Sequence, residues 1–231
     1  MEPTSQKKSV FQGKKLAFWL DIALNLIIIV GLVVIIRSFL ISPFQVFGSS
    51  MCDTFNYFDG QCQNGYGEYI IVNKFGYLNI FGWKIGSPER GDVIIFHPPH
   101  NDQEFFIKRV IGLPGETVKI KDRKVHIVND EHPDGMVQEE PYLNSRNTNN
   151  TKPREAGDVF EIPDDNYFVL GDNRLGSSDS RSCFKESVSQ GKCGENGNSP
   201  YLTLDHIEGK ALLVLWPLSS LSIVSDPLYN L

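Results

Sequence analysis

The sequence predicts an all-β, antiparallel domain that follows a single N-terminal transmembrane helix. After residue 36 the apolar runs are short and rich in β-branched and aromatic residues, and turn-forming residues interrupt them about every eight to twelve positions. Before residue 37, by contrast, one continuous run of 21 residues contains only two clearly polar side chains. The two parts therefore belong to different structural classes.

The apolar run at residues 16–36 is long enough to cross a bilayer. At a rise of about 1.5 Å per residue, a helix of about 20 residues spans the ~30 Å hydrocarbon core. A buried core helix is an alternative, but such helices are rarely apolar on every face. A cleaved signal peptide is a second alternative, yet no small-x-small cleavage site follows the run. We therefore expect an uncleaved signal anchor in a lipid bilayer.

The charges around this run predict its orientation. Four lysines precede it, with Glu2 as the only opposing charge, whereas Arg37 is the only charge between the run and Asp53. The positive-inside rule then places residues 1–15 in the cytoplasm and residues 37–231 outside it, in a single-pass protein of the cell membrane. The exported part has 18 basic and 26 acidic side chains, so we expect no nucleic-acid partner.

The exported part is predicted to be one domain of short strands with few helices. The clearest strands are expected at residues 69–72, 93–96, 105–111, 167–170 and 211–216. Residues 117–121 and 124–128 alternate apolar and polar side chains around Asp122-Arg123, which predicts a half-exposed hairpin. Polar stretches near 129–157 and 183–200 are expected to be insertions, and residues 144–157 within the first are expected to form a surface loop.

Four cysteines in the exported part form two pairs, each ten positions apart: Cys52 with Cys62, and Cys183 with Cys193. Local disulfides are the leading interpretation, since the compartment permits oxidation and a loop of about ten residues is stabilised by roughly 3 kcal/mol in the chain-entropy model. The pairing cannot be derived from the sequence. A zinc site is an alternative, but C-x2-C spacing is absent, so we expect no metal. Free thiols are the third alternative.

Two segments carry reactive side chains in suggestive surroundings. Residues 44–55 place hydroxyl groups in a small-residue turn, and residues 105–116 place Lys108 within an apolar strand. Taken singly, serines beside glycine usually form turns, and a strand lysine usually faces solvent. A serine becomes a nucleophile when a base takes its proton, and burial can lower a lysine pKa from about 10.4 by 3 to 5 units. The five histidines are isolated or flank prolines, which disfavours a histidine base.

Five segments then occur in a characteristic order. Residues 50–54 read Ser-Met-Cys-Asp-Thr, and they are followed by segments 67–74, 90–94 with 107–115, 171–181, and Gly209-Lys210-Ala211. Together these segments resemble the motifs of bacterial type I signal peptidases, the membrane-anchored Ser/Lys endopeptidases of the leader peptidase family. The resemblance covers nearly the whole chain. It implies a barrel-like catalytic domain that cleaves signal peptides from exported preproteins as a serine protease (a hydrolase), without a cofactor.

The resemblance also implies roles for individual residues. Ser50 would be the nucleophile, Lys108 the general base, and Ser177 the group that orients the lysine amine. Asp179 and Arg181 match a supporting ion pair. The other implied positions are Asp172, Asn173 and Arg174 in the supporting loop, and Phe44, Val46, Met51 and Ile107 in substrate binding.

Two residues depart from the family pattern. Asp53 occupies the position where the family usually has proline, so a bond between Cys52 and Cys62 would then supply the rigidity of this loop. Gly48 occupies a position where some members have a serine that binds the oxyanion. The backbone N–H of Ser50 would carry more of that stabilisation, and one such donor contributes about 3 kcal/mol.

Two alternative functions stay open at this point. One is a catalytically silent, membrane-anchored β domain that binds exported segments, and the departures at Asp53 and Gly48 are its main support. The other is a related Ser/Lys maturation protease with a narrow substrate range.

Overall fold

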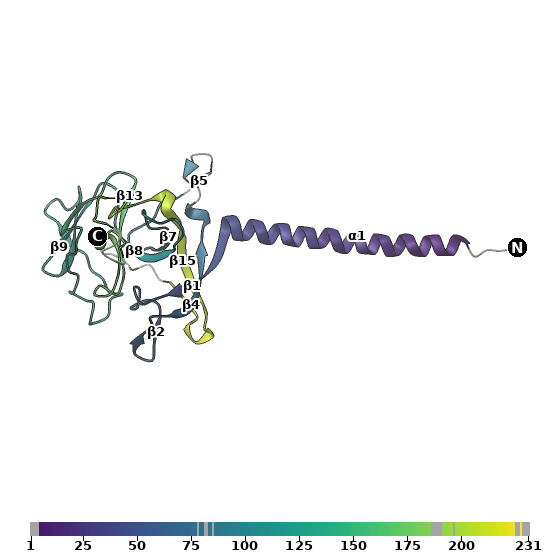
Figure 1. Cartoon of the computed structure of the whole chain (residues 1–231), viewed down its shortest axis with the longest axis horizontal. Coiled ribbons are helices and arrows are strands. Elements are labelled where there is room, and N and C mark those ends of the chain that lie inside the picture. Colours follow the sequence, from purple (N-terminus) through teal and green to yellow (C-terminus); the bar gives the residue numbers. More distant parts are fainter. Residues whose placement is uncertain are drawn as a thin grey trace. The chain divides into compact units, whose positions relative to one another are not determined.

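The computed structural model describes residues 5–77, 79–80, 83–84, 86–185, 191–195, 197–224 and 227. The chain divides into two units, Met1–Ile41 and Ser42–Leu231. The first unit contains α1 (Ser5–Ile35), which continues as a short π-helix, η1 (Ile36–Leu40) (Figure 1). No proline occurs between Pro3 and Pro43, so nothing interrupts the helical hydrogen bonds. The segment Ala17–Leu40, which covers the second part of α1 and all of η1, has a mean hydropathy of 2.7. It is long and apolar enough to cross a membrane.

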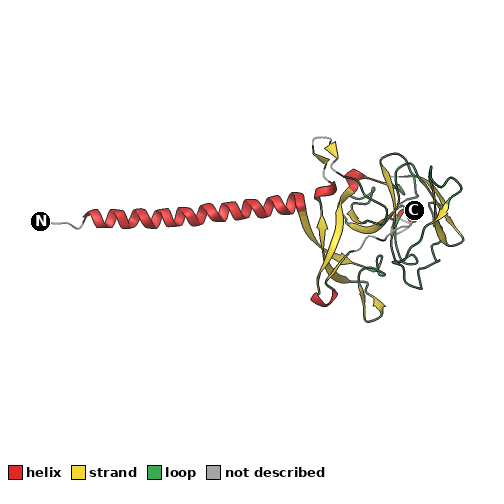
Figure 2. Cartoon of the chain, turned by 180° about the vertical axis from the view of Figure 1, so that it is seen from behind, coloured by secondary structure: helices red, strands yellow, loops and turns green. Residues whose placement is uncertain are grey.

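The second unit is built on an eight-stranded sheet, and Figure 2 shows how strands dominate its regular structure. The strands follow the order β1-β4-β15-β7-β8-β13-β14, and β16 pairs with β15. The pairs of β15 with β4, β7 and β16, of β8 with β7 and β13, and of β13 with β14 are all antiparallel. Register shifts along β15 bend the sheet. The strands are β1 (Ile41–Phe47), β4 (Tyr66–Asn73), β7 (Val93–Phe96), β8 (Phe106–Gly112), β13 (Asn166–Leu170), β14 (Leu202–Thr203), β15 (Ile207–Trp216) and β16 (Ser222–Ile223).

A second, four-stranded sheet has the order β11-β10-β9-β12. Its β9–β10 hairpin is the one predicted from alternation, because Lys121 pairs with Lys124 and the two turn residues, Asp122 and Arg123, have φ of 52° and 62°. Two positive φ values are the signature of a tight hairpin turn. Its strands are β9 (Thr117–Lys121), β10 (Lys124–Val128), β11 (Met136–Val137) and β12 (Val159–Glu161).

The remaining regular elements are short. Within the part of the chain that the structure describes, two small hairpins and four 3-10 turns connect the strands, so the predicted all-β, antiparallel fold with few helices is confirmed. They are β2 (Tyr57–Phe58), β3 (Gln61–Cys62), β5 (Asn79–Ile80), β6 (Trp83–Lys84), η2 (Phe75–Tyr77), η3 (Ser180–Ser182), η5 (Leu204–His206) and η6 (Leu218–Ser220).

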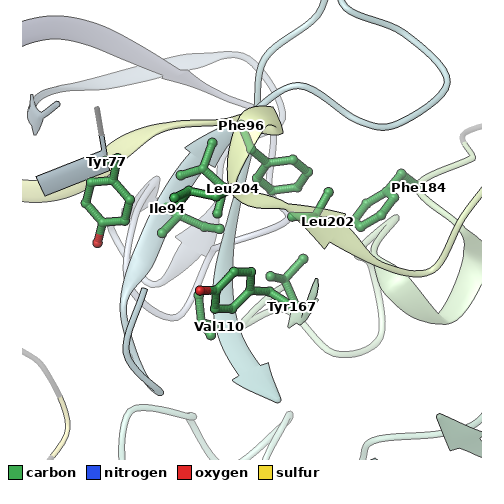
Figure 3. Packing of buried hydrophobic residues seen from close by; sticks show 10 residues of the cluster. Tyr77, Ile94, Phe96, Val110, Tyr167, Phe184, Leu202 and Leu204 are labelled. Atoms are coloured by element: carbon green, nitrogen blue, oxygen red, sulfur yellow. The ribbon is translucent and has the colours of Figure 1, made fainter. Parts of the chain in front are cut away.

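The core is organised around β7, whose four residues are all buried. Ile94 and Phe96 face one hydrophobic cluster, shown in Figure 3, whereas Val93 and Ile95 face another. Because successive side chains of a strand point to opposite faces, a strand covered on both faces reads as a continuous apolar run. This explains the uninterrupted Val-Ile-Ile-Phe sequence. The rigid strand β8 pairs with β7 and carries Lys108.

The polar segment 144–157 differs from its prediction as a surface loop. Asn147 is 4% exposed and Thr151 is 1% exposed, so the prediction is wrong for these two residues. Both side chains are buried because they hydrogen-bond to charged groups, Asn147 to Asp53 and Thr151 to Arg174. In the predicted insertion near 183–200, residues 186–190 and 196 lie outside the described part of the chain.

Candidate active site

Ser50 lies in the tight turn that follows β1. The amide N–H of Cys52 donates to the Ser49 carbonyl at 3.1 Å, and that of Thr54 donates to the Met51 carbonyl at 2.8 Å. Gly48 enters the turn with φ of +83°, a conformation that glycine adopts at little cost. A disulfide joins Cys52 to Cys62 across a Cα–Cα distance of 5.5 Å. The second bond, Cys183 to Cys193, is also local and lies away from this turn in sequence.

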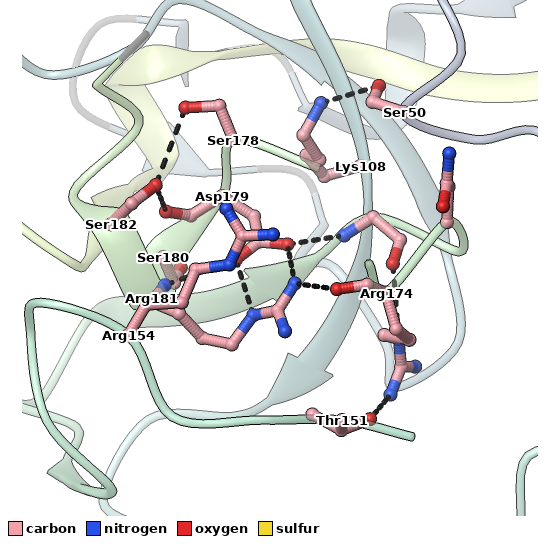
Figure 4. A network of polar contacts seen from close by, with 12 residues as sticks. Ser50, Lys108, Thr151, Arg154, Arg174, Ser178, Asp179, Ser180, Arg181 and Ser182 are labelled. Atoms are coloured by element: carbon pink, nitrogen blue, oxygen red, sulfur yellow. Dashed lines mark hydrogen bonds and ion pairs between the residues drawn. The ribbon is translucent and has the colours of Figure 1, made fainter. Parts of the chain in front are cut away.

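Lys108 approaches the Ser50 hydroxyl from β8. Its side chain is almost completely buried, and its Nζ lies 2.9 Å from Ser50 Oγ and donates to the Ile107 carbonyl at 2.9 Å (Figure 4). The centroid of the Phe106 ring lies 5.1 Å from Lys108 Nζ. A serine hydroxyl within hydrogen-bond reach of a buried amine is the geometry that nucleophile and base require. The two residues predicted as a dyad are thus brought together.

The loop that follows β13 holds the Ser50 turn in place. The amide N–H of Asn173 donates to the Ser50 carbonyl at 3.0 Å, and its side-chain amide donates to the Ser49 carbonyl at 3.0 Å. At Gly171, an added Cβ would lie only 2.1 Å from Ser177 Oγ and 2.5 Å from the Ser50 carbonyl oxygen. Only glycine therefore fits where the two segments meet.

Arg109 and Asp172 form a buried ion pair below the turn. Arg109 Nη2 lies 2.7 Å from Asp172 Oδ2, and its Nε donates to Oδ1 at 3.0 Å. Arg109 also donates to Thr54 Oγ1 at 3.0 Å, and Thr54 donates to Asp172. The Ser50 turn is thereby tied to β8, the strand that carries Lys108. Thr54 was not among the predicted site residues, although it completes the matched motif 50–54.

Asp179 and Arg181 form a second, fully buried pair. Arg181 donates to both carboxylate oxygens, at 2.8 and 2.7 Å, and the amide N–H of Gly171 donates to Asp179 Oδ2 at 3.1 Å. Burial alone would raise the pKa of Asp179, but the Arg181 charge and these hydrogen bonds outweigh it and lower the pKa. The pair predicted as a support is therefore formed, and it fixes Gly171 beside Ser50.

Ser177 is buried next to the dyad. It lines the same cavity as Ser50 and Lys108. Among the described residues, however, its Oγ has no partner in hydrogen-bonding geometry. The predicted contact with the Lys108 amine is thus not formed in this structure, and the orienting role of Ser177 stays a prediction.

Ser50 and Lys108 line a cavity of about 710 Å³. Phe44 and Val46 of β1 and Ile107 of β8 line it, as the substrate-binding prediction requires. Met51 does not, because its side chain is buried in the core and its sulfur accepts from the Asp172 N–H at 3.4 Å. Glu104, Arg154 and Lys185 also line the cavity and were not predicted. None of the five histidines is among its lining residues.

Two further features bear on the chemistry. Within the described residues, the backbone N–H of Ser50 donates no hydrogen bond. The described residues also contain no group of three or more His, Cys, Asp and Glu side chains arranged to hold a metal ion.

The comparison with known proteins decides the family. Residues 19–216 match the family described as "Signal peptidase, peptidase S26". The chain belongs to this signal peptidase family. Among its relatives, a signal peptidase I of Bacillus amyloliquefaciens is 36% identical over 185 residues, which cover 78% of this chain and 83% of the relative. Signal peptidase IB of Staphylococcus aureus is 31% identical over 205 residues, which cover 84% of this chain and 87% of the relative.

Two further matches cover a smaller share of this chain than the two relatives above. Signal peptidase I of Pseudomonas aeruginosa is 35% identical over 65% of this chain, and the match spans 58% of that relative's length. The crystal structure of a signal peptidase I from Enterococcus faecalis V583 is 32% identical over 56% of this chain and 97% of its own, with a TM-score of 0.36. The family match confirms the predicted family and the predicted activity of a serine endopeptidase that cleaves signal peptides.

Membership in the signal peptidase family also fits the first unit of the chain. A single apolar N-terminal helix in a protein of this family indicates a membrane-anchored protein.

Proposed function

We propose that this signal peptidase cleaves preproteins with Ser50 as nucleophile and Lys108 as general base. The observation that supports this most directly is the 2.9 Å separation of Lys108 Nζ and Ser50 Oγ at the wall of the cavity. A catalytically silent binding domain has no need to bury a lysine amine against a serine hydroxyl, because burial of a charged amine is costly.

The chemistry follows from these two groups. Neutral Lys108 accepts the Ser50 proton while Oγ attacks the carbonyl carbon of the scissile peptide bond. The backbone N–H of Ser50 stabilises the oxyanion that forms. The Lys108 ammonium then protonates the leaving amine, which is the new N-terminus of the mature protein. Lys108 next accepts a proton from water, the hydroxide attacks the acyl ester, and Ser50 recovers its proton from Lys108.

The substrate would bind as an extended strand along β1. β1 lies at one end of the main sheet order, so its outer edge can pair with a peptide through main-chain hydrogen bonds. The rings of Phe44 and Phe105 form part of the cavity wall, with their centroids 5.1 Å apart. Val46 and Ile107 add further apolar surface to this wall. These walls favour small side chains at the first and third positions before the cut.

Anchoring would bring the dyad and the cleavage site to the same depth. The apolar segment ends at Leu40, so Ser50 follows it by ten residues, which reach at most about 35 Å when fully extended. The substrate's own apolar segment would be held in the same bilayer, which assists its positioning. We propose that residues 1–15 are cytoplasmic and that the catalytic domain lies outside the cytoplasm.

Preprotein cleavage by the purified full chain in lipid vesicles tests this proposal. We expect mature products whose new N-termini follow a small residue, as measured by mass spectrometry. Substrates with leucine in place of alanine at the first or third position before the cut should lose at least about 90% of cleavage, because the three extra carbon atoms of leucine would overpack walls that suit a small side chain. A preprotein with leucine at the second position is the matched control.

Two outcomes would favour other functions. Binding of every preprotein without any cleavage would support the silent domain. Cleavage of a single substrate from a broad panel would support a narrow maturation protease. Cleavage that tolerates leucine equally at all three positions would contradict the proposed substrate site.

A further inference from the structure

Residues 140–151, here called the strap, run from one contact with Arg174 to another. Arg174 Nη1 donates to Glu140 Oε2 at 2.9 Å and to Thr151 Oγ1 at 2.7 Å. Between these ends, the ring of Tyr142 packs against the Arg109 guanidinium, with 3.9 Å between the ring centroid and Arg109 Cζ. The next residue, Leu143, is buried. Both arginines are almost completely buried, so the strap is fixed to rigid parts of the active site.

Asp53 joins the strap to the nucleophile turn. Its Oδ2 accepts from the Asn144 backbone N–H at 2.7 Å, and its Oδ1 accepts from the side-chain amides of Asn144 at 2.7 Å and Asn147 at 2.9 Å. All three N–H groups donate to Asp53. A carboxylate can accept from all of them with its two oxygens, whereas an asparagine side chain has only one acceptor oxygen. Burial raises the pKa of Asp53, and the hydrogen bonds from Asn144 and Asn147 oppose that rise.

We propose that Asp53 is a positioning residue that holds Ser50 in line with Lys108 by fastening its turn to the strap; this inference rests on the proposed role of Ser50. Asp53 lies three residues after Ser50, and the backbone N–H of Asn173 holds the Ser50 carbonyl. Arg174, the neighbour of Asn173, is the residue that anchors both ends of the strap. The turn is thus held at Ser50 and at Asp53 by one connected network.

The position of Asp53 gives this role a specific reason. It stands where the matched motif usually has proline, a residue that stiffens a turn through its own ring. An aspartate cannot do so, but its carboxylate can fix the same turn through partners elsewhere in the chain. The polar segment 144–147, which looks like an insertion in the sequence, supplies those partners.

The test is the kinetics of preprotein cleavage by full-length variants in vesicles. For Asp53→Ala we expect kcat to fall about 10- to 100-fold while KM changes less than about twofold, because Ser50 is displaced but the substrate walls on β1 and β8 are unchanged. The kcat of Asp53→Asn should lie between those of the wild type and Asp53→Ala, because asparagine keeps the shape of the side chain but replaces one acceptor oxygen with a donor NH2 group. Asp164→Ala, which removes an exposed aspartate on the same unit, is the matched control and should keep wild-type kinetics.

A double variant separates positioning from general loss of structure. Asn147→Ala should also lower kcat, and the double variant Asp53→Ala/Asn147→Ala should be less impaired than the product of the two single effects, because the two residues share one hydrogen bond. All assays are run well below each variant's measured Tm. Wild-type kcat for folded Asp53→Ala, a loss confined to KM, or fully multiplicative effects would each overturn the inference.

Ser50→Ala is measured in parallel to keep the two proposals apart. If Ser50→Ala is inactive and Asp53→Ala is normal, the inference about Asp53 fails alone. If Ser50→Ala retains activity, the proposed nucleophile itself is wrong.

Discussion

Ser50→Ala and Lys108→Ala should each reduce kcat for preprotein cleavage by at least about 10⁴-fold, because either change removes half of the proton-transfer pair. Their side chains meet at 2.9 Å, so each variant removes one partner and leaves the other without its function. Both variants should still fold, since neither side chain belongs to the hydrophobic clusters that form the core. The measurement is single-turnover cleavage with a range of enzyme concentrations.

Controls and a double variant sharpen this result. Ser49→Ala changes the neighbouring hydroxyl, and Lys119→Ala removes an exposed lysine of β9; both should keep kcat within about twofold. Ser50→Ala/Lys108→Ala should be no slower than either single variant, because residues that act as one unit have non-additive effects. Near-normal turnover by Ser50→Ala would contradict the mechanism.

Asp179→Ala should cause the largest loss of stability among the supporting residues. It leaves Arg181 buried and charged without its carboxylate, and it removes the acceptor for the Gly171 N–H. Breaking a buried pair from one side costs roughly 3 to 5 kcal/mol. In a domain of this size that lowers Tm by on the order of 10 °C. Thermal unfolding followed by circular dichroism in detergent measures the shift, and Asp164→Ala is again the control.

The pH dependence of stability gives an independent check on Asp179. Because its folded-state pKa is lowered, the carboxylate stabilises the folded protein above its unfolded pKa of about 3.9, and this contribution is lost as the pH falls through the folded value. The wild-type Tm should therefore fall more steeply in acid than the Tm of Asp179→Ala. Parallel acid curves for the two proteins would show that the ion pair contributes nothing to stability.

Much of the fold could be predicted because local patterns determined it. The alternation at residues 117–128 predicted the β9–β10 hairpin, and the apolar run at 93–96 predicted a strand, which the structure forms as β7. The apolar N-terminal run gave one long helix. In each case neighbouring residues carry enough information to choose the element.

The architecture of the site depended on contacts that local patterns do not encode. Ser50 and Lys108 are 58 positions apart, and only the family resemblance placed them in one site. Asn147 and Thr151 looked like surface residues because their burial requires partners, Asp53 and Arg174, from distant segments. Thr54 belongs to the matched motif, but its contacts with Arg109 and Asp172 depend on distant segments.

The dependence of kcat/KM on pH tests the central claim, a serine activated by Lys108, most directly. Only the neutral amine can accept the Ser50 proton, so we expect activity to be lost on acidification, with a midpoint above the ~6.5 of an unperturbed histidine and below the ~10.4 of an unperturbed lysine. No replacement of a histidine should move that midpoint. A midpoint near 6.5 that disappears when one of the five histidines is replaced, while Lys108→Ala stays active, would contradict the account.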